Sequence, residues 1–325
     1  MSTEIVTVDI GGTHARFALA AIAADGTIEL GEPATLHTKD HASFQTAWQD
    51  FAQQQGGTLP PAVAIAVAGP VGGEMIRFTN NPWIIRPALI PEKLGAARYT
   101  VVNDFGAVGH AVACADQSHF IHLAGPDADL PESGTISIVG PGTGLGVAHV
   151  WRDGAGSYRV QATEGGHIDY APLDSIEDAI LARLRQRYRR VSVERVVSGP
   201  GIVDIYEALA AMEGRAIQSL DDRTLWQLGT TGEDSLAAAA VDRFCLSLGA
   251  IAGDIALAQG ASGVVIAGGL GLRIRDTLTR SGFASRFTAK GRFEGMMATL
   301  PVKLITHPQP GLFGAAAAFA KEHLS

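Results

Sequence analysis

Two glycine-rich turns carry the residues of this sequence with the clearest chemical potential. "DIGGT" (Asp9 to Thr13) stands between the apolar runs Ile5–Val8 and Arg16–Ala20, and "GPGTGLG" (Gly140 to Gly146) stands in a similar setting. Glycine allows a backbone to turn tightly and to approach a ligand closely, and successive N–H groups in such a turn form a concave anion site. Taken singly, either turn could be an ordinary hairpin turn or a glycine bulge. Together they predict a cradle for the phosphates of one nucleotide, held between two domains.

The residues within these turns narrow the kind of nucleotide site. Thr13 adds a hydroxyl donor, and Asp9, which would repel a bare phosphate, suits a magnesium ion carried by the nucleotide. Neither the dinucleotide fingerprint G-x-G-x-x-G nor a Walker A lysine is present, and a strand rather than a helix is expected after each turn. A nicotinamide dehydrogenase is therefore disfavoured.

A candidate general base follows an apolar strand in "VVNDFG". Asp104 could accept a proton from a hydroxyl nucleophile, and Asn103 could hold a neighbouring group. The carboxyl ends of strands in α/β sheets are where ligands bind. The residues alone favour a plainer role for Asp104, as the N-cap of the following helix.

Further polar residues gather in "TEGGHID", which contains Glu164, His167 and Asp169, and in "VSVERVVSGPG", which contains Glu194. Carboxylates and an imidazole can hydrogen-bond adjacent sugar hydroxyls. A metal site is less well supported, because the cluster lacks further cysteine or histidine ligands. Taken alone, Glu194 fits a solvated or capping residue better than a ligand.

The surrounding pattern predicts the elements that position these residues. Strands alternate with helices, which indicates an α/β fold, and a similar hairpin begins each half. The Pro-, Gly- and acid-rich segment Ala124–Gly134 is expected to be a domain boundary or a surface loop. Expected helices are Ser43–Gln55, 105–115, Ser175–Arg190, Leu236–Gln259 and Leu312–His323, and expected strands include Ala62–Pro70, 99–104 and Val264–Ala267.

Bulk composition excludes several classes of function. The chain has 325 residues, of which 46% are hydrophobic, and its net charge is −8. A large core is therefore available, while broad contact with nucleic acid or an anionic membrane is disfavoured. The arginine-rich run Arg183–Arg190 is expected to be a solvated or interfacial helix face. Cys114 and Cys245 are expected to be buried thiols in a reducing cytoplasm, and the apolar stretch Leu246–Gly271 a buried helix followed by a buried strand.

Taken together, the motifs resemble the bacterial glucokinase family of the actin-like sugar kinases. The resemblance covers nearly the whole chain. It is carried by "DIGGTHARFAL", "TNNPW", "NDFGAV", "GPGTGLGVAH", "EGGHIDYAP", "VERVVSGPG", "IAGGLG", "GFASRFTAKGRF" and "HPQPGLFGAAA".

The resemblance implies a two-lobed actin-like (ribonuclease-H-like) ATPase fold with its active site in the cleft between the lobes. Residues 1–112 and about 308–325 would form a small α/β domain, and residues 113–307 a large one. The implied activity is phosphorylation of glucose by MgATP, in a cytoplasmic enzyme that is a homodimer. Asp9, Gly11, Gly12 and Thr13 would form one phosphate loop and Gly142, Thr143 and Gly144 the other, with Gly268 and Gly269 against the adenosine. Asp104 would be the base, and Asn103, Asp104, Glu164, His167 and Glu194 would bind the sugar.

Some features depart from the family pattern or leave choices open. His14 replaces the asparagine that often follows "GGT", and the cysteine-rich zinc motif of related proteins is absent, so no structural zinc is expected. No protein ligand is expected to hold a metal directly, and Asn81 is expected only to support the sugar site. Another hexose, such as mannose, fructose or N-acetylmannosamine, and a donor such as polyphosphate or ADP stay open. A non-catalytic sugar sensor and a filament-forming ATPase are the alternatives from other functional classes.

Overall fold

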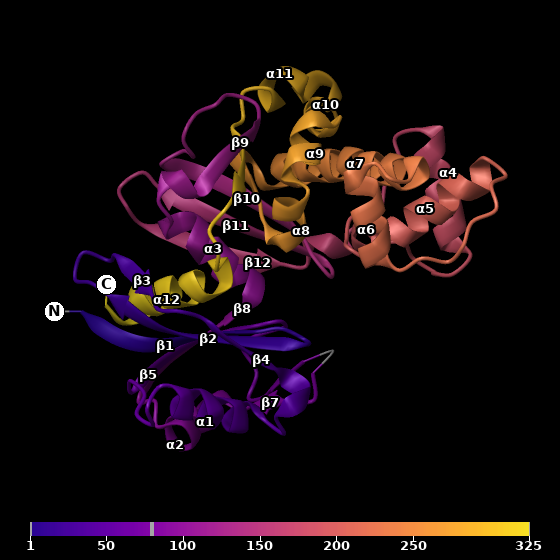
Figure 1. Cartoon of the computed structure of the whole chain (residues 1–325). Coiled ribbons are helices and arrows are strands. Elements are labelled where there is room, and N and C mark those ends of the chain that lie inside the picture. The colour runs from indigo at the N-terminus through magenta and orange to yellow at the C-terminus, as the bar shows by residue number, and fades with distance from the viewer. Residues whose placement is uncertain (1, 79–80, 325) are drawn as a thin grey trace. The chain divides into compact units, whose positions relative to one another are not determined.

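The computed structural model describes residues 2–78 and 81–324, which fall into two compact units (Figure 1). Unit 1 comprises Met1–Ala115 and His307–Ser325, and unit 2 comprises Asp116–Thr306. Each unit has its own mixed sheet with helices packed on it. Thr79 and Asn80 of the "TNNPW" motif lie outside the described residues.

Unit 1 is built on a six-stranded sheet of order β3-β2-β1-β5-β8, with β4 also paired to β2. β1 and β2 are antiparallel, whereas β1, β5 and β8 are parallel to one another. The elements are β1 (Thr3–Ile10), β2 (His14–Ile22), β3 (Ile28–Leu30), β4 (Ala34–His37), α1 (Phe44–Gln54), β5 (Ala62–Val67), β6 (Ile76–Arg77), β7 (Ile84–Ile85), α2 (Ile90–Leu94), β8 (Arg98–Asn103), α3 (Asp104–Cys114) and α12 (Pro310–His323).

The sequence of β5, "AVAIAV", explains how helices cover both faces of this sheet. Its valines and isoleucine pack with the aromatic residues of α1, and its alanines pack with α3 and α12 (Figure 1). Small side chains on the second face allow α12 to approach closely, and Thr7 donates a buried hydrogen bond of 2.7 Å to the Leu312 carbonyl. Gly314 is the closest point, since a Cβ there would lie 1.8 Å from the Ala107 carbonyl oxygen. The last helix of the chain is thus part of the core of unit 1.

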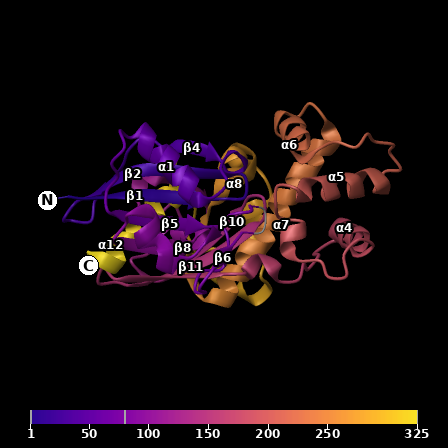
Figure 2. The same cartoon turned by 90° about the horizontal axis from the view of Figure 1, so that it is seen from below.

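Unit 2 has a six-stranded sheet of order β12-β11-β10-β13-β14-β9, and its larger share of helices surrounds α7. Figures 1 and 2 both place α4, α5 and α6 around one end of α7. The elements are β9 (Phe120–Ala124), β10 (Ser133–Pro141), β11 (Leu145–Asp153), β12 (Tyr158–Thr163), α4 (Ser175–Arg185), α5 (Gly201–Met212), α6 (Asp222–Thr231), α7 (Ser235–Gln259), β13 (Ala261–Ile266), α8 (Gly268–Arg273), α9 (Arg275–Arg280), α10 (Phe283–Thr288), α11 (Glu294–Met297) and β14 (Val302–Ile305).

The two sheets repeat one pattern of strand order and direction. The strand order β3-β2-β1-β5-β8 of unit 1 matches the order β12-β11-β10-β13-β14 of unit 2. In each sheet the strands on one side of β1 or β10 pair antiparallel, and those on the other side pair parallel. The turn between β1 and β2 therefore corresponds to the turn between β10 and β11. Both predicted glycine turns occupy the same place in their own sheets.

Most expected elements are confirmed, with small changes at their ends. The hairpins, β5, β8, α1, α3, α7, β13 and α12 are present. The segment Ala124–Gly134 lies within unit 2 as a mostly exposed loop between β9 and β10, so the alternative of a domain boundary there is wrong. The expectation of a helix to Arg190 is wrong, because α4 ends at Arg185. Cys245 is buried as expected, but Cys114 at the end of α3 is exposed.

The arginine run is engaged in ion pairs within unit 2. Arg183 pairs with Glu207 at 2.6 Å, and Arg187 pairs with Asp204, both acids lying on α5. These contacts favour the expected interfacial role. The 25-residue helix α7 is long and apolar enough to cross a membrane, but most of its apolar stretch is buried inside the protein, as in a core helix.

Candidate active site

The first glycine turn, between β1 and β2, is held in place by its carbonyl groups. Asn81 Nδ2 donates to the Gly11 carbonyl at 3.3 Å, and the hydroxyl and amide of Thr38 donate to the carbonyls of Gly12 and Thr13 at 2.9 and 3.0 Å. Within residues 2–78 and 81–324, the amides of Gly12 and Thr13 have no acceptor. The turn therefore leaves two adjacent N–H donors available to an anion.

Asp9 lies just before this turn and is partly paired. Burial raises the pKa of its carboxyl group above the usual range, and Arg16, whose Nη1 lies 3.4 Å from Oδ2, offsets only part of that effect. Gly311, in the first turn of α12, allows this approach, because a Cβ there would lie 2.8 Å from Asp9 Oδ2. A partly buried carboxylate in this situation would be stabilised by a further cation.

His14, which stands where family members often have asparagine, contacts a neighbouring strand of the sheet in unit 1. It pairs with His37 across β2 and β4, and the two imidazole rings lie with their centroids 4.5 Å apart. Substituting the common asparagine by histidine therefore adds a ring contact within unit 1. The backbone of the turn does not depend on this side chain.

The second glycine turn, between β10 and β11, is closed on itself and tied to the segment before α5. Gly142 N–H donates to the Gly144 carbonyl at 2.8 Å, and Gly199 N–H donates to the Gly142 carbonyl at 2.7 Å. The amides of Thr143 and Gly144 have no acceptor within the described part of the chain. This turn thus presents the same arrangement as the first, with two adjacent free N–H donors.

Glu194 contacts the second turn directly. Its Oε2 atom accepts the N–H of Leu145 at 2.9 Å. A Cβ on Gly144 would lie only 2.4 Å from the same oxygen, so glycine is needed at this position for the carboxylate to reach the backbone. The plainer possibility of a fully solvated Glu194 is therefore wrong.

Gly268 and Gly269 begin α8, beside the same turn. Gly268 adopts φ +82°, and a Cβ there would lie 2.5 Å from the Pro141 carbonyl oxygen. Both facts require glycine at this position. A Cβ on Gly269 would meet nothing within 4 Å, so space is open on that side of the helix start.

In unit 1, Asn103 and Asp104 mark the junction of β8 and α3. Asn103 is the N-cap: its Oδ1 accepts the amides of Phe105 and Gly106, both at 3.0 Å. Its Nδ2 donates to the Gly69 carbonyl at 3.2 Å and keeps a second hydrogen for another partner. Asp104 is the first residue of the helix itself, so the capping role considered for Asp104 belongs to Asn103.

In unit 2, Glu164 and His167 flank a tight turn that lies against β11. Gly165 and Gly166 allow that approach, because Cβ atoms there would lie 2.9 Å from the Val147 side chain and 2.2 Å from the Leu145 carbonyl oxygen. The side chains of Glu164 and His167 are 79% and 57% exposed, so both are open to a ligand. The Oε2 and Nε2 atoms of the pair are 3.9 Å apart.

A short backbone pairing joins this turn to the segment that carries Glu194. Val193 N–H donates to the Ile168 carbonyl at 2.9 Å, and Tyr170 N–H donates to the Val191 carbonyl at 3.0 Å. Arg190 and Asp169 add an exposed ion pair of 2.6 Å. The predicted sugar ligands of unit 2 are thus held on two paired segments, while Asp169 is occupied by Arg190.

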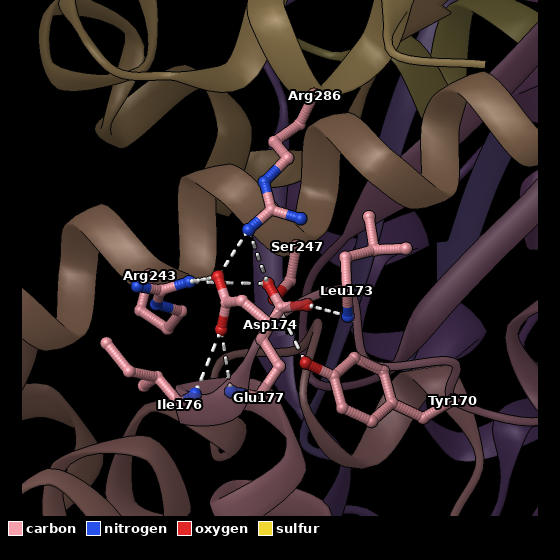
Figure 3. Close-up of polar contacts among 8 residues, drawn as sticks. All are labelled: Tyr170, Leu173, Asp174, Ile176, Glu177, Arg243, Ser247 and Arg286. Atoms are coloured by element: carbon pink, nitrogen blue, oxygen red, sulfur yellow. Dashed lines mark hydrogen bonds and ion pairs between the residues drawn. The ribbon is translucent and has the colours of Figure 1, made fainter. Parts of the chain in front are cut away.

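Next in the chain comes a partly buried ionic cluster that the sequence did not indicate (Figure 3). Asp174 caps α4 and accepts bonds of 2.5 Å from Arg243 on α7 and Arg286 on α10. Although desolvation opposes ionisation, the Glu177 amide and the two guanidinium groups hold the pKa of Asp174 below its usual range. Glu177, almost fully buried, accepts the Leu173 amide at 2.7 Å.

Tyr170 belongs to the same cluster. Its hydroxyl lies 3.4 Å from Ser247 Oγ on α7 (Figure 3), and burial together with the charge of Glu177 raises its pKa. The residues that follow His167 are therefore anchored to two core helices. "YAP" in the sequence gave no hint of this anchor, because the partners lie about 70 or more residues away.

Comparison with known proteins assigns the chain. The Glucokinase family profile matches residues 6–322. The chain belongs to the glucokinase family. It is 60% identical over 320 residues to the glucokinase of Zymomonas mobilis subsp. mobilis, an alignment covering 98% of each protein. It is 40% identical over 321 residues to that of Paramagnetospirillum magneticum, covering 97% of each.

One solved structure gives the same assignment, and a more distant one shares the fold. A glucokinase from an Antarctic psychrotroph matches with a TM-score of 0.86 and 35% identity, covering 98% of this chain and 99% of that one. A ROK family glucokinase from Streptomyces griseus, solved in complex with glucose and AMPPNP, matches with a TM-score of 0.61 and 17% identity, covering 96% and 98%. The fold expected from the resemblance, the two-lobed actin-like ATPase fold, is confirmed.

Proposed function

We propose that this member of the glucokinase family transfers the γ-phosphoryl group of ATP to the 6-hydroxyl of glucose with Asp104 as the general base. ATP-dependent phosphorylation of glucose is the activity of the family to which it belongs. The assignment of residues rests on the pair of equivalent glycine turns. Hydrogen bonds from other segments fix each turn, and two N–H donors in each turn have no acceptor in the described chain. Such fixed donors stabilise phosphate charge without reorganising during the reaction.

The phosphates of ATP are assigned to these two turns. Gly11, Gly12 and Thr13 form one cradle, and Gly142, Thr143 and Gly144 the other, with Gly268 and Gly269 of α8 beside the adenosine. Open space next to Gly269 and the exposure of the Thr13 and Thr143 side chains favour this role. The hydroxyls of both threonines are additional donors to phosphate oxygens.

Asp104 is assigned as the base because of its place at the start of α3. The carboxylate stands at the carboxyl end of β8, and its Oδ1 accepts the Phe105 amide at 2.8 Å, which orients it. In the reaction, the 6-hydroxyl oxygen attacks the γ-phosphorus, its proton passes to Asp104, and ADP departs. Phosphoryl transfer requires mainly positioning and charge stabilisation. The one further requirement is a base that accepts the hydroxyl proton, and a single oriented carboxylate can supply it.

Glucose is assigned to the polar side chains near that base and on the paired segments of unit 2. Asn103 retains one Nδ2 hydrogen, Glu164 and His167 are exposed, and Glu194 retains one oxygen beyond the one that holds Leu145. This mixture of donors and acceptors suits the several hydroxyls of a hexose.

Magnesium fits the residues near the first turn as an ion that arrives with the nucleotide. Among the described residues, no three His, Cys, Asp or Glu side chains are grouped so as to hold a metal. One partly buried carboxylate, Asp9, is nevertheless available beside the turn, and Mg²⁺ is commonly held by one or two carboxylates plus substrate phosphates. When bound, the ion would neutralise charge on the transferring phosphates.

The decisive experiment is a coupled assay for glucose 6-phosphate with MgATP and a panel of hexoses, on the native enzyme and on Asp104→Asn. We expect glucose to be the preferred hexose and the variant to lose several orders of magnitude in kcat while glucose still binds by calorimetry. Equal turnover of the variant would refute the base. Glucose binding without transfer by the native protein would favour the sugar sensor or a different donor.

Two further expectations from the family resemblance belong to the proposal. We expect a homodimer, which mass measurement by light scattering would test, and a cytoplasmic location, which cell fractionation would test.

A further inference from the structure

We propose that Glu194 couples glucose binding to nucleotide binding, because one carboxylate both contacts the sugar and fixes the second phosphate turn. This inference rests on the proposed function for the identity of the two ligands. The coupling itself is argued from contacts within unit 2. Glu194 then acts as a positioning residue for the nucleotide in addition to its role toward the sugar.

The clamp segment, Glu194 to Gly199, holds the second turn at both ends. Glu194 Oε2 accepts the Leu145 amide at 2.9 Å, and Gly199 N–H donates to the Gly142 carbonyl at 2.7 Å. The clamp is itself fixed, since Trp226 Nε1 donates to the Gly199 carbonyl at 2.9 Å. The clamp therefore adds to the Gly142–Gly144 hydrogen bond and the β10–β11 pairing that already shape the turn, and it fixes the backbone on both sides of the two free donors.

The carboxylate of Glu194 is the adjustable part of this clamp. The Gly199 contact joins two backbones, whereas Glu194 reaches the turn through rotatable side-chain bonds. A sugar hydroxyl that donates to the remaining oxygen, Oε1, would hold the carboxylate in the orientation that binds Leu145. The nucleotide would then meet a turn that is already ordered, so less conformational entropy is lost on binding.

Coupling of this kind is reciprocal. If glucose tightens nucleotide binding by some factor, the nucleotide must tighten glucose binding by the same factor. We expect a factor of at least about five, the lower end of ordinary coupling between sites. Isothermal titration calorimetry with AMPPNP and Mg²⁺, with and without saturating glucose, measures this factor, and titration of glucose with and without AMPPNP measures it again.

Two glycines of the turn provide matched variants. In Gly144→Ala the new methyl group would lie 2.4 Å from Glu194 Oε2 and must displace the carboxylate, whereas in Gly142→Ala it would meet nothing within 4 Å. Neither glycine has a positive φ, so alanine is not strained by the backbone at either position. Both variants place a methyl group in the phosphate turn, and either can weaken nucleotide binding itself. The two variants are therefore distinguished only by the ratio of their AMPPNP affinities with and without glucose.

We expect the native ratio to be preserved in Gly142→Ala and to fall to about one in Gly144→Ala. A native ratio of one, or equal ratios in the two variants, overturns the coupling. If Gly144→Ala does not fold, Glu194→Gln serves instead, because a neutral amide oxygen is a weaker acceptor for the Leu145 amide; an unchanged ratio there also overturns it. Native protein that binds neither ligand refutes the proposed function together with this inference, whereas binding and phosphoryl transfer with a ratio of one refutes the coupling alone.

Discussion

Replacing Glu177 by glutamine tests whether the ionic cluster of Figure 3 stabilises unit 2. The substitution keeps the shape of the side chain and an oxygen that can accept the Leu173 amide, but it removes one of two carboxylates facing two guanidinium groups. The native cluster of Asp174, Glu177, Arg243 and Arg286 is formally neutral. The variant leaves one uncompensated positive charge in a largely buried position.

The magnitude follows from the distances. Glu177 Oε1 lies 3.6 Å from Arg243 and 3.7 Å from Arg286. At an effective dielectric constant of about 20, each pair is worth about 4–5 kcal/mol of gross attraction. Desolvation of the buried ions offsets much of this, and breaking a buried pair typically costs about 3–5 kcal/mol. We therefore expect the free energy of unfolding to fall by about that amount and the melting temperature by about 6–20 °C.

Differential scanning calorimetry and urea unfolding measure the effect against a matched control. Asp178→Asn removes a charge from the next position of α4, where the side chain is exposed, and we expect a loss below about 1 kcal/mol. The double variant Glu177→Gln/Arg286→Gln restores neutrality, so its loss should be smaller than the sum of the two single losses. A loss below about 1 kcal/mol for Glu177→Gln, or strictly additive losses in the cycle, would refute this reasoning.

Three other predictions concern unit 1. Gly314→Ala places a methyl group 1.8 Å from the Ala107 carbonyl oxygen, so we expect the free energy of unfolding in urea to fall by about 3 kcal/mol or more. As a control from unit 2, Gly295→Ala places its methyl group with nothing within 4 Å, and its free energy of unfolding should stay nearly unchanged. Burial, with a smaller contribution from Lys321, lowers the pKa of His110 to about 4 from an ordinary 6.5. Between pH 6.5 and 4 the imidazole of His110 is therefore protonated in the unfolded chain but neutral in the folded one. The free energy of unfolding should fall by about 3 kcal/mol as pH drops through this range. His110→Leu should flatten that part of a stability–pH profile, and an unchanged profile would contradict the assignment. Thr38→Val removes the hydroxyl that holds the Gly12 carbonyl, so the KM for ATP should rise several-fold while glucose affinity measured by calorimetry stays constant; a change confined to glucose would count against a phosphate role for this turn.

Local sequence signals were sufficient for the framework of the fold. Apolar runs ended by glycine predicted the β1–β2 and β10–β11 hairpins, and the apolar pattern predicted α7 and β13, because those signals depend on neighbouring residues. Helix ends were less certain. α4 stops at Arg185 although arginines continue to Arg190, and Asn103 rather than Asp104 caps α3. In both cases hydrogen-bond geometry decides the boundary among residue types that are all acceptable there.

The supports of the candidate site could not be predicted, because they are contacts between distant segments. Thr38 and Asn81 hold the carbonyls of the first turn from 26 and 70 residues away, and Glu194 reaches Leu145 across 49 residues. Nothing about a threonine before a lysine indicates such a partner. The family resemblance gave Asn81 a supporting place near the sugar, whereas the structure shows it bound to the Gly11 carbonyl of the first turn. The residues that could face a ligand were recognisable by type and by family resemblance, and their roles in catalysis stay predictions.

The closure of unit 1 by α12 has a consequence for biosynthesis. A ribosome that has released residues up to Thr306 has delivered the whole of unit 2, whereas unit 1 still lacks its last helix. Until Pro310–His323 emerges, the alanine face of β5 lacks one of its two covering helices, and the Thr7 hydroxyl lacks the Leu312 carbonyl to which it donates a hydrogen bond. The strands of unit 1 are thus made early and covered late, and a nascent chain interrupted before Pro310 would expose the alanine face of β5 to chaperones and proteases.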